Sequence, residues 1–212
     1  MAGKRKEKLA AFNRANIMES ASQLFQEKGI DGTTMDDIAK AAEYSKTTIY
    51  SYFGSKEDLV NHMIYDGMEL FKNQLREEAD QSTSFEDFYK GFCVLIAKIH
   101  DEHPIYYAGI AGVVTCDENA PATDILKKIY ISGEEVNQIV EEKLAQGVKA
   151  KEIALDAGGM GSTMMFMWFC IMGIIEKSAV KQDYITFKLG STKQDFTDLA
   201  FKKLYGLLTK KK

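Results

Sequence analysis

The segment from residue 33 to residue 59, TTMDDIAKAAEYSKTTIYSYFGSKEDL, predicts two short helices, a tight turn between them and the start of a third helix. Thr34 stands where an N-cap belongs, ahead of two aspartates whose charge favours the positive end of the first helix. Ser45 is suited to cap the second helix, and Gly54 ends it. This spacing is typical of a helix-turn-helix unit, so the start of the chain is expected to form a small helical domain.

The second short helix, residues 46–52, carries lysine, hydroxyl and tyrosine side chains, and no acidic residue stands between Ser45 and Lys56. Ile49 and Phe53 are its plainly apolar residues, enough to hold one face against neighbouring helices. The other side chains are poor core material but suit a DNA groove and its phosphates. The alternative is an ordinary surface hairpin; the tyrosine density and the missing acids favour DNA binding.

Positive charge is concentrated at the N-terminus of a chain that is acidic overall. Residues 1–16 contain five basic residues and one acidic residue, a net charge of +4, whereas the whole 212-residue chain has a net charge of −4. Through Lys56, nine basic and seven acidic residues give +2, which leaves −6 for the remainder. Phosphate contacts act within about 8 Å, so a local basic region is compatible with DNA binding by an acidic protein. The alternative is that this N-terminal segment is a solvated, frayed tail. The two interpretations are compatible if the segment becomes ordered only when it binds DNA.

The segment Leu24 to Val60 resembles the DNA-binding region of the TetR/AcrR family of bacterial transcriptional regulators. The positions that match the family pattern at fixed spacing are Phe25, Gly29, Thr33, Thr34, Ile38, Ala39, Tyr50, Phe53, Ser55, Lys56, Glu57 and Leu59. Three positions depart from it: Glu43 replaces the usual turn glycine, Tyr44 an aliphatic residue and Thr47 a glycine. A glutamate at a turn position that needs a positive φ costs about 1 kcal/mol relative to glycine, so either the turn differs slightly from the family's or the strain is tolerated.

The resemblance implies an all-α protein with a helix-turn-helix DNA-binding domain of three helices and a basic arm in residues 1–55. Residues 56–212 are then expected to form a larger helical domain for effector binding and dimerisation. The implied function is a ligand-responsive DNA-binding transcriptional regulator, a homodimeric repressor in the cytoplasm that a small-molecule effector releases from a double-stranded DNA operator. The alternative is a small-molecule-binding or membrane-associated helical protein without sequence-specific DNA binding.

The resemblance also implies DNA-binding roles for individual residues. Lys46, Thr47 and Ser51 are expected to face base edges in the major groove, and the Thr47 methyl group offers a contact for thymine. The residues expected to hold phosphates are Thr34, Ser45, Thr48, Tyr50, Tyr52 and Lys56. Tyr44 is open to either role or to packing inward.

The lack of any long alternating pattern, together with a count of only 2 prolines, predicts an all-helical chain. About nine helices are expected, at residues 8–28, 35–42, 46–52, 56–79, 85–101, 104–114, 122–145, 151–177 and 193–209. The well-separated Cys93, Cys116 and Cys170 indicate reduced thiols rather than a disulfide framework. The initial MAGKRKEK is not expected to be a signal peptide, since no apolar core follows it.

Residues 157–175, AGGMGSTMMFMWFCIMGII, form a run of 19 residues without a charge, long enough to span a membrane. Four glycines, two hydroxyl residues, the acidic flanks Asp156 and Glu176, and the central position of Trp168 argue against a span. The run is therefore expected to be a buried helix with one face toward the core and the other toward a partner subunit, in a protein that does not bind membranes.

Methionine and aromatic side chains in and near this run offer a flexible, polarizable lining for an effector cavity. The candidate lining residues are Phe88, Phe92, Tyr106, Tyr107, Met164, Met165, Trp168 and Phe169. Each of them alone is also consistent with plain core packing, and the case for a cavity comes from the family resemblance. The effector is expected to be apolar or aromatic, and the acidic body also allows a cationic one.

His100 and His103 are three residues apart at the end of a predicted helix, a spacing that also occurs in metal sites. Because no cysteine or third histidine stands at ligand spacing, a polar helix end is favoured over a metal centre, and no cofactor is expected. The sequence has no glycine-rich phosphate loop, nucleophile elbow or HExxH motif, so the chain is not expected to be an enzyme.

Overall fold

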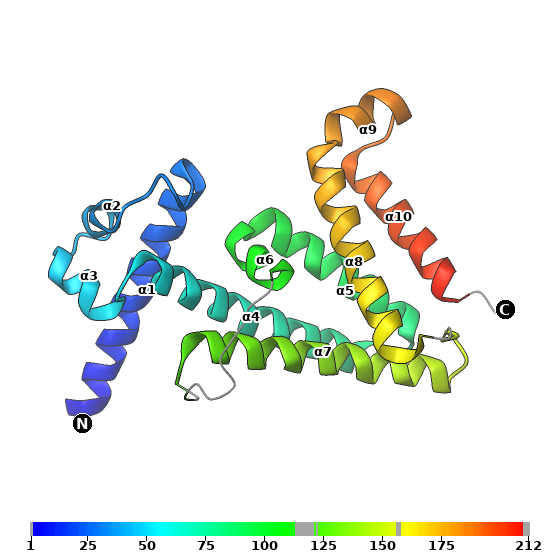
Figure 1. Ribbon diagram of the computed structural model, residues 1–212, viewed down its shortest axis with the longest axis horizontal. Helices are drawn as coiled ribbons and strands as arrows, with labels where there is room; N and C mark the ends of the chain where they lie inside the picture. The colour runs from blue at the N-terminus through cyan, green and yellow to red at the C-terminus, as the bar shows by residue number, and fades with distance from the viewer. Residues whose placement is uncertain (1, 113–120, 122, 156–157, 210–212) are drawn as a thin grey trace. The chain divides into compact units, whose positions relative to one another are not determined.

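The computed structural model describes residues 2–112, 121, 123–155 and 158–209, and over these residues the chain is all-helical, as predicted, with ten helices and no strand (Figure 1). The chain divides into two compact units, Met1–Met63 and Ile64–Lys212. One helix, α4 (Lys56–Gln81), begins in the first unit and continues into the second. The expected functional boundary after residue 55 directly precedes this helix and stays a prediction.

The first unit consists of α1 (Ala2–Lys28), α2 (Met35–Ala41), α3 (Lys46–Tyr52) and the first two turns of α4. Its core is made of apolar side chains that are almost fully buried: Ile17, Ala21, Phe25, Ile38, Ile49, Phe53 and Leu59. The two predicted N-caps are present, since Thr34 accepts from the Asp37 amide and Ser45 accepts from the Thr48 amide, each at 3.1 Å. The short helices α2 and α3 therefore begin where the sequence predicts.

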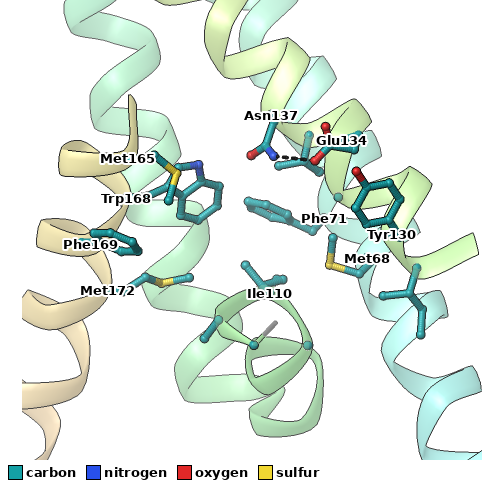
Figure 2. A pocket seen from close by; sticks show the side chains of 16 residues that line it. Met68, Phe71, Ile110, Tyr130, Glu134, Asn137, Met165, Trp168, Phe169 and Met172 are labelled. Atoms are coloured by element: carbon teal, nitrogen blue, oxygen red, sulfur yellow. Dashed lines mark hydrogen bonds between the residues drawn. The ribbon is translucent and has the colours of Figure 1, made fainter. Parts of the chain in front are cut away.

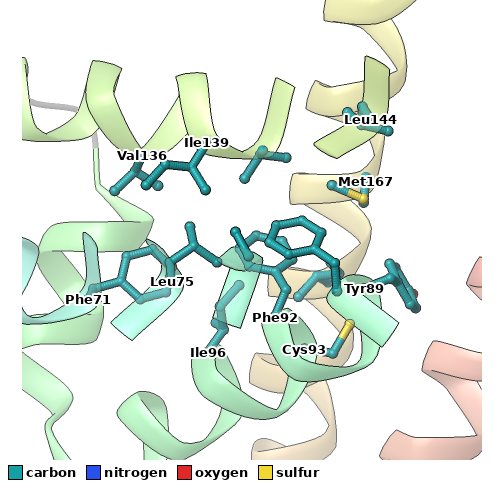
Figure 3. Close-up of a cluster of buried hydrophobic side chains, with 14 of the residues drawn as sticks. Phe71, Leu75, Tyr89, Phe92, Cys93, Ile96, Val136, Ile139, Leu144 and Met167 are labelled. Carbon is teal, nitrogen blue, oxygen red and sulfur yellow. The ribbon is translucent and has the colours of Figure 1, made fainter. Parts of the chain in front are cut away.

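The second unit is built around α5 (Phe85–Glu102), whose Phe88, Phe92 and Ile96 have no exposed surface. The other helices of this unit are α6 (Pro104–Ala111), α7 (Ile125–Lys149), α8 (Gly159–Val180), α9 (Gln182–Leu189) and α10 (Lys193–Leu208). Figure 3 shows side chains from α4, α5, α7 and α8 meeting in this core. The Tyr89 hydroxyl donates to the Phe201 carbonyl at 3.0 Å and thereby joins α5 to α10.

Ion pairs fix α4 against α7 along the surface. The Lys72 ammonium lies 2.6 Å from both Glu69 and Glu135, and the Arg76 guanidinium lies 2.9 Å from Glu142. Such partly exposed pairs contribute little stability individually. Their effect here is to set the register of the two long helices that carry one wall of a cavity described below.

Helices α4 and α6 approach each other closely at two glycines. A Cβ atom placed on Gly67 of α4 would collide with the ring of Tyr106 on α6, and one placed on Gly109 of α6 would collide with Ile64 on α4. Each glycine therefore accepts a large side chain of the other helix, and any larger residue at either position would force the helices apart.

Two expectations about the second unit differ from the structure, and a third lies partly outside the described residues. The helix expected at 151–177 begins at Gly159, because the chain first makes a turn in which Lys151 has a φ of 63°. The short α9, which Gly190 ends in the left-handed conformation, was not predicted and makes the tenth helix. Residues 113 and 114 of the helix expected at 104–114, and Cys116, lie outside the described residues, whereas Cys93 and Cys170 are free thiols.

Helix α8 has an inner face buried in the core and an outer face that is apolar but exposed. Met167, Ile171 and Ile175 are buried, whereas Phe169 is 67% exposed and Val180 is 76% exposed. Within the described residues α8 is the one helix long and apolar enough to cross a membrane, which by itself is weak evidence for a span. The expected contact of α8 with the core is confirmed, and the expected contact with a partner subunit stays a prediction.

Candidate functional site

Helix α3 presents a polar face to solvent and an apolar face to the core. Ile49 and the following Phe53 are fully buried, whereas Thr47, Tyr50 and Ser51 are exposed. Because α3 is only 7 residues long, its position depends on this apolar face and on its N-cap. The arrangement leaves hydroxyl groups and a tyrosine ring free to meet another molecule.

The N-cap of α3 also orders the first residues of this exposed face. The Ser45 and Thr48 hydroxyls lie 2.8 Å apart, and Ser51 donates to the Thr48 carbonyl at 2.7 Å. The Lys46 ammonium lies 2.7 Å from Asp36 at the start of α2, and this hydrogen bond raises the pKa of Lys46. Both partners of the pair are more than half exposed, so a phosphate or a base can compete for Lys46 at small cost.

Thr34 caps α2 through a capping box. Its hydroxyl donates to the Asp37 carboxylate at 2.6 Å, and its backbone N–H donates to the same carboxylate at 3.0 Å. These hydrogen bonds hold the pKa of Asp37 below its ordinary value. The hydroxyl of Thr34 is thus already engaged in the helix start, and its expected phosphate contact stays a prediction.

Asn13 of α1 links the turn before α3 to the end of α3. Tyr44 donates its hydroxyl to the Asn13 Oδ1 atom at 2.9 Å, and the Asn13 Nδ2 atom donates to the Tyr52 hydroxyl at 3.0 Å. Tyr44 and Tyr52 are both half-buried. Tyr44 and the Tyr52 hydroxyl are thus bonded to Asn13 in the structure, and the DNA contacts expected of both stay predictions.

Lys56, also expected to hold a phosphate, is engaged within the protein. Its ammonium donates to the carbonyls of Ile30 at 2.6 Å and Thr33 at 2.9 Å, in the connection between α1 and α2. Because both contacts join residues more than 20 positions apart, no local pattern could have predicted them. In this position Lys56 ties the start of α4 to the loop before the helix-turn-helix.

The turn between α2 and α3 keeps the backbone geometry of a glycine turn although the residue is glutamate. Glu43 has a φ of 59°, in the left-handed region that disfavours side chains with a Cβ atom. The backbone N–H of Tyr44 donates to the Ala39 carbonyl at 3.0 Å and closes the turn. Of the two possibilities at Glu43, a different turn or a tolerated strain, the structure has the second.

A cavity of about 370 Å³ opens between α4, α6, α7 and α8 in the second unit (Figure 2). Phe71 and Met68 come from α4, Ile110 from α6, and Val136 and Ile129 from α7. Helix α8 contributes Met165, Trp168, Phe169 and Met172. The volume and the apolar lining are those of a small-molecule site.

The cavity includes some but not all of the residues predicted to line it. Met165, Trp168 and Phe169 line it. Phe88 and Phe92 lie in the core, because α5 is the central helix of the unit, and Met164 packs at the edge of that core. Tyr106 stacks on His103, and the Tyr107 hydroxyl donates to Glu176 at 3.3 Å. The lining residues of α4, α6 and α7 were not predicted, because long-range packing alone brings them to this place.

Trp168 has two environments. Its ring meets those of Phe71 and Phe92 edge-on, with centroids 6.4 Å and 5.2 Å away. Its Nε1 atom is buried and has no hydrogen-bond partner among the described residues. A buried donor without a partner costs free energy, so the Trp168 indole N–H at this wall of the cavity is available for a hydrogen bond to a ligand.

The histidine pair of the predicted helix end lies outside this cavity. His100 is bonded to Asp101 at 2.8 Å and meets the Tyr107 ring edge-on at 4.7 Å. In the part of the chain that the structure describes, no three His, Cys, Asp or Glu side chains form a group that could hold a metal ion.

A helix-turn-helix with an exposed polar second helix, joined to a larger helical unit, defines a DNA-binding transcriptional regulator. Residues 17–63 match the family model for bacterial regulatory proteins of the tetR family. This match agrees with the resemblance of the segment Leu24 to Val60 to the TetR family, and the similar proteins below support a regulator of that kind.

Similar proteins include IcaR, the negative transcriptional regulator of the biofilm operon icaADBC. IcaR of Staphylococcus epidermidis is 26% identical over 140 residues, which cover 66% of this chain and 71% of IcaR. IcaR of Staphylococcus aureus strain Newman is 24% identical over 177 residues, covering 81% and 91%. The crystal structure of FadR from Bacillus subtilis in complex with stearoyl-CoA superposes with a TM-score of 0.62 at 17% identity, covering 90% of this chain and 97% of FadR, and shows the same fold.

Proposed function

We propose that the chain is a homodimeric repressor that binds its operator through α3 and is released when a small molecule fills the cavity between α4, α6, α7 and α8. The single observation that carries the DNA-binding part is the exposed polar face of α3 on a buried apolar anchor. The relatives of similar length are negative transcriptional regulators, which supports repression. Such a protein acts in the cytoplasm and needs no catalytic residue.

The exposed residues of α3 are the best candidates for contacts with DNA. Thr47, Ser51 and Lys46 would contact base edges. Lys46 would do so by leaving its ion pair with Asp36 and bonding to the DNA instead. Ser45, Thr48 and Tyr50 would contact phosphates, with the free hydroxyl of Tyr50 at the exposed edge. Tyr44, Tyr52 and Lys56 would act mainly by holding α3 and the start of α4 in position.

The outer faces of α8 and α10 are suited to a subunit interface. These two helices pack side by side, and the exposed apolar residues on them include Phe166, Phe169, Val180, Leu199 and Leu207. Exposed apolar surface of this extent marks an interaction site in a soluble protein. A dimer formed here would also place two copies of α3 on one operator, whose half-sites are about 34–36 Å apart or a multiple of that.

The proposed coupling between effector and DNA runs through α4. Met68 and Phe71 of this helix line the cavity, and the same helix begins at Lys56 in the DNA-binding unit. A ligand that favours one position of α4 shifts the population of DNA-competent dimers. FadR was solved in complex with stearoyl-CoA, a ligand with a long apolar acyl chain, which supports a small-molecule effector with an apolar or aromatic part here.

The test is binding to the DNA that flanks the gene for this chain, measured by fluorescence anisotropy with and without candidate effectors. We expect a shift at low salt that Thr47→Ala redirects toward other operator sequences, since Thr47 would contact a base. Thr123→Ala, an exposed threonine before α7, is the matched control and is expected to leave the preference unchanged. The absence of any shift at low salt would exclude the proposal and favour a ligand-binding or membrane-associated protein.

A further inference from the structure

The cavity in the second unit has one ionised group in its wall. Among the described residues that line it, Glu134 of α7 is the one charged side chain, and no lysine, arginine or histidine takes part. The other polar side chains there are Asn137, the Tyr130 hydroxyl and the Trp168 indole. The wall therefore offers a negative charge to a ligand and no positive charge.

Glu134, like Glu141 of the same helix, has no ion-pair partner among the described residues, but Glu134 alone of these two lines the cavity. Glu135 is paired with Lys72 and Glu142 with Arg76. The Glu134 carboxylate instead accepts a hydrogen bond from the Asn137 amide at 3.2 Å, drawn as a dashed line in Figure 2. Glu134 is an exposed residue, and this bond leaves its charge without a cationic partner among the described residues.

Aromatic rings form much of the remaining wall. Phe71 and Tyr130 lie on the α4 and α7 side, and Trp168 and Phe169 lie on the α8 side (Figure 2). The face of an aromatic ring attracts a cation, and tryptophan does so most strongly. The attraction is stronger where water is excluded than at an exposed site. The rings and the carboxylate thus favour the same sign of ligand charge.

We propose that the effector of this protein is an organic cation with an apolar or aromatic body, its positive charge directed at Glu134. This inference rests on the proposed effector role of the cavity and specifies the chemistry of the ligand. An anionic ligand, such as a fatty acid or an acyl-CoA, would meet a like charge at Glu134 and find no cationic partner in the described wall.

The position of Trp168 makes ligand occupancy directly measurable. It is the single tryptophan of the chain and lines the cavity, so its fluorescence, excited at wavelengths that phenyl groups do not absorb, reports a ligand at this place.

Three probes share one phenylbutyl body and differ in charge at neutral pH: 4-phenylbutylamine, 4-phenylbutanol and 4-phenylbutyrate. We expect the amine to bind about fivefold more tightly than the alcohol, and the acid to bind most weakly, a modest range because Glu134 is exposed to solvent.

The decisive variant is Glu134→Gln, which keeps the shape of the side chain and removes its charge. It is expected to abolish the advantage of the amine while leaving the affinity for the alcohol unchanged. Glu141→Gln makes the same charge change on an exposed residue of α7 that does not line the cavity, and should leave all three affinities unchanged.

Three results would overturn the inference: tighter binding of the acid, no response of Trp168 to the amine, or an equal amine preference in Glu134→Gln. Operator binding is a separate readout that tests the proposed function. If the amine binds through Glu134 but no operator is recognised, the proposed function fails and the charge preference stands. If the operator is recognised but the acid binds best, the proposed function stands and the proposed charge preference fails.

Discussion

The hydroxyl of Tyr44 donates a hydrogen bond of 2.9 Å to the side-chain oxygen of Asn13, which lies 31 positions earlier in the chain. The same amide donates to the Tyr52 hydroxyl, so one residue of α1 holds both ends of the segment that contains α3. Tyr52, expected at a phosphate, and Tyr44, for which inward packing was also open, thereby both support α3 in the structure.

Asn13→Ala is expected to weaken binding to every operator alike, by about three- to tenfold, because it loosens α3 without removing a base contact. Anisotropy titrations on the parent operator and on single-base variants measure this. Gln23→Ala, an exposed amide on α1, is the control and should bind as the parent does. A change in which operator Asn13→Ala prefers would place Asn13 in direct base recognition instead.

Lys56→Met is expected to lower the free energy of unfolding by about 1–2 kcal/mol, because two backbone carbonyls lose a charged donor. The salt dependence of DNA binding should stay that of the parent. Urea denaturation and titrations at several salt concentrations measure the two effects, and Lys40→Met, at an exposed lysine of α2, serves as the control. Unchanged stability with a salt slope lowered by about one would instead assign Lys56 to a phosphate.

Glu43→Gly is expected to raise the free energy of unfolding by about 1 kcal/mol, because glycine adopts a φ of 59° without strain. Urea denaturation measures the change. Lys151→Gly, at a φ of 63° in the second unit, should shift stability in the same direction without touching the DNA-binding unit. If Glu43→Gly were destabilising, the glutamate side chain would have to supply a compensating contact.

Thr34→Val should make the stability of the protein less dependent on acid pH. The hydrogen bonds from Thr34 lower the pKa of Asp37 in the folded state, so the ionised carboxylate stabilises the fold above about pH 4 and this contribution is lost as the pH falls through the folded pKa. The difference in stability between parent and variant should therefore be largest near neutral pH and shrink in acid. Thr34→Ser keeps the hydroxyl, and its pH profile should follow that of the parent.

Phe166→Glu is expected to convert the proposed dimer to a monomer, because it places a charge on the exposed apolar face of α8. Operator affinity should then fall by at least about tenfold, since two linked copies of α3 no longer bind together. Analytical ultracentrifugation measures the mass. Val94→Glu, at a residue of α5 that is 60% exposed, should leave the mass unchanged. A dimeric Phe166→Glu would place the interface elsewhere.

The local parts of the fold were predictable from the sequence because they depend on residues a few positions apart. The caps at Thr34 and Ser45, the buried Ile49 and the strained turn at Glu43 all belong to this class. By contrast, α9 buries little beyond Ile185 and leaves Tyr184 and Phe187 exposed, so it carries no amphipathic pattern.

The candidate sites were predictable only in part, because distant segments complete them. Lys56 and Tyr52 find partners that no spacing rule connects to them. In the cavity, α8 was correctly expected to contribute Trp168, whereas Phe71 reaches it through the packing of α4. Aromatic composition alone could not separate Phe92, at the centre of the core, from residues at the cavity wall.

Because α4 and α6 approach closely at Gly67 and Gly109, binding of a compound in the cavity and release of the operator need not go together. Tyr106 and Ile64 fill the space at these glycines, so, if the cavity takes the effector as proposed, a compound large enough to press α6 against α4 would displace α4 as well. A compound that fits without moving α6 would leave α4 where it is and the operator bound. Such a small compound would act as an antagonist of the natural inducer, so bulk as well as affinity would decide which compounds switch the gene on.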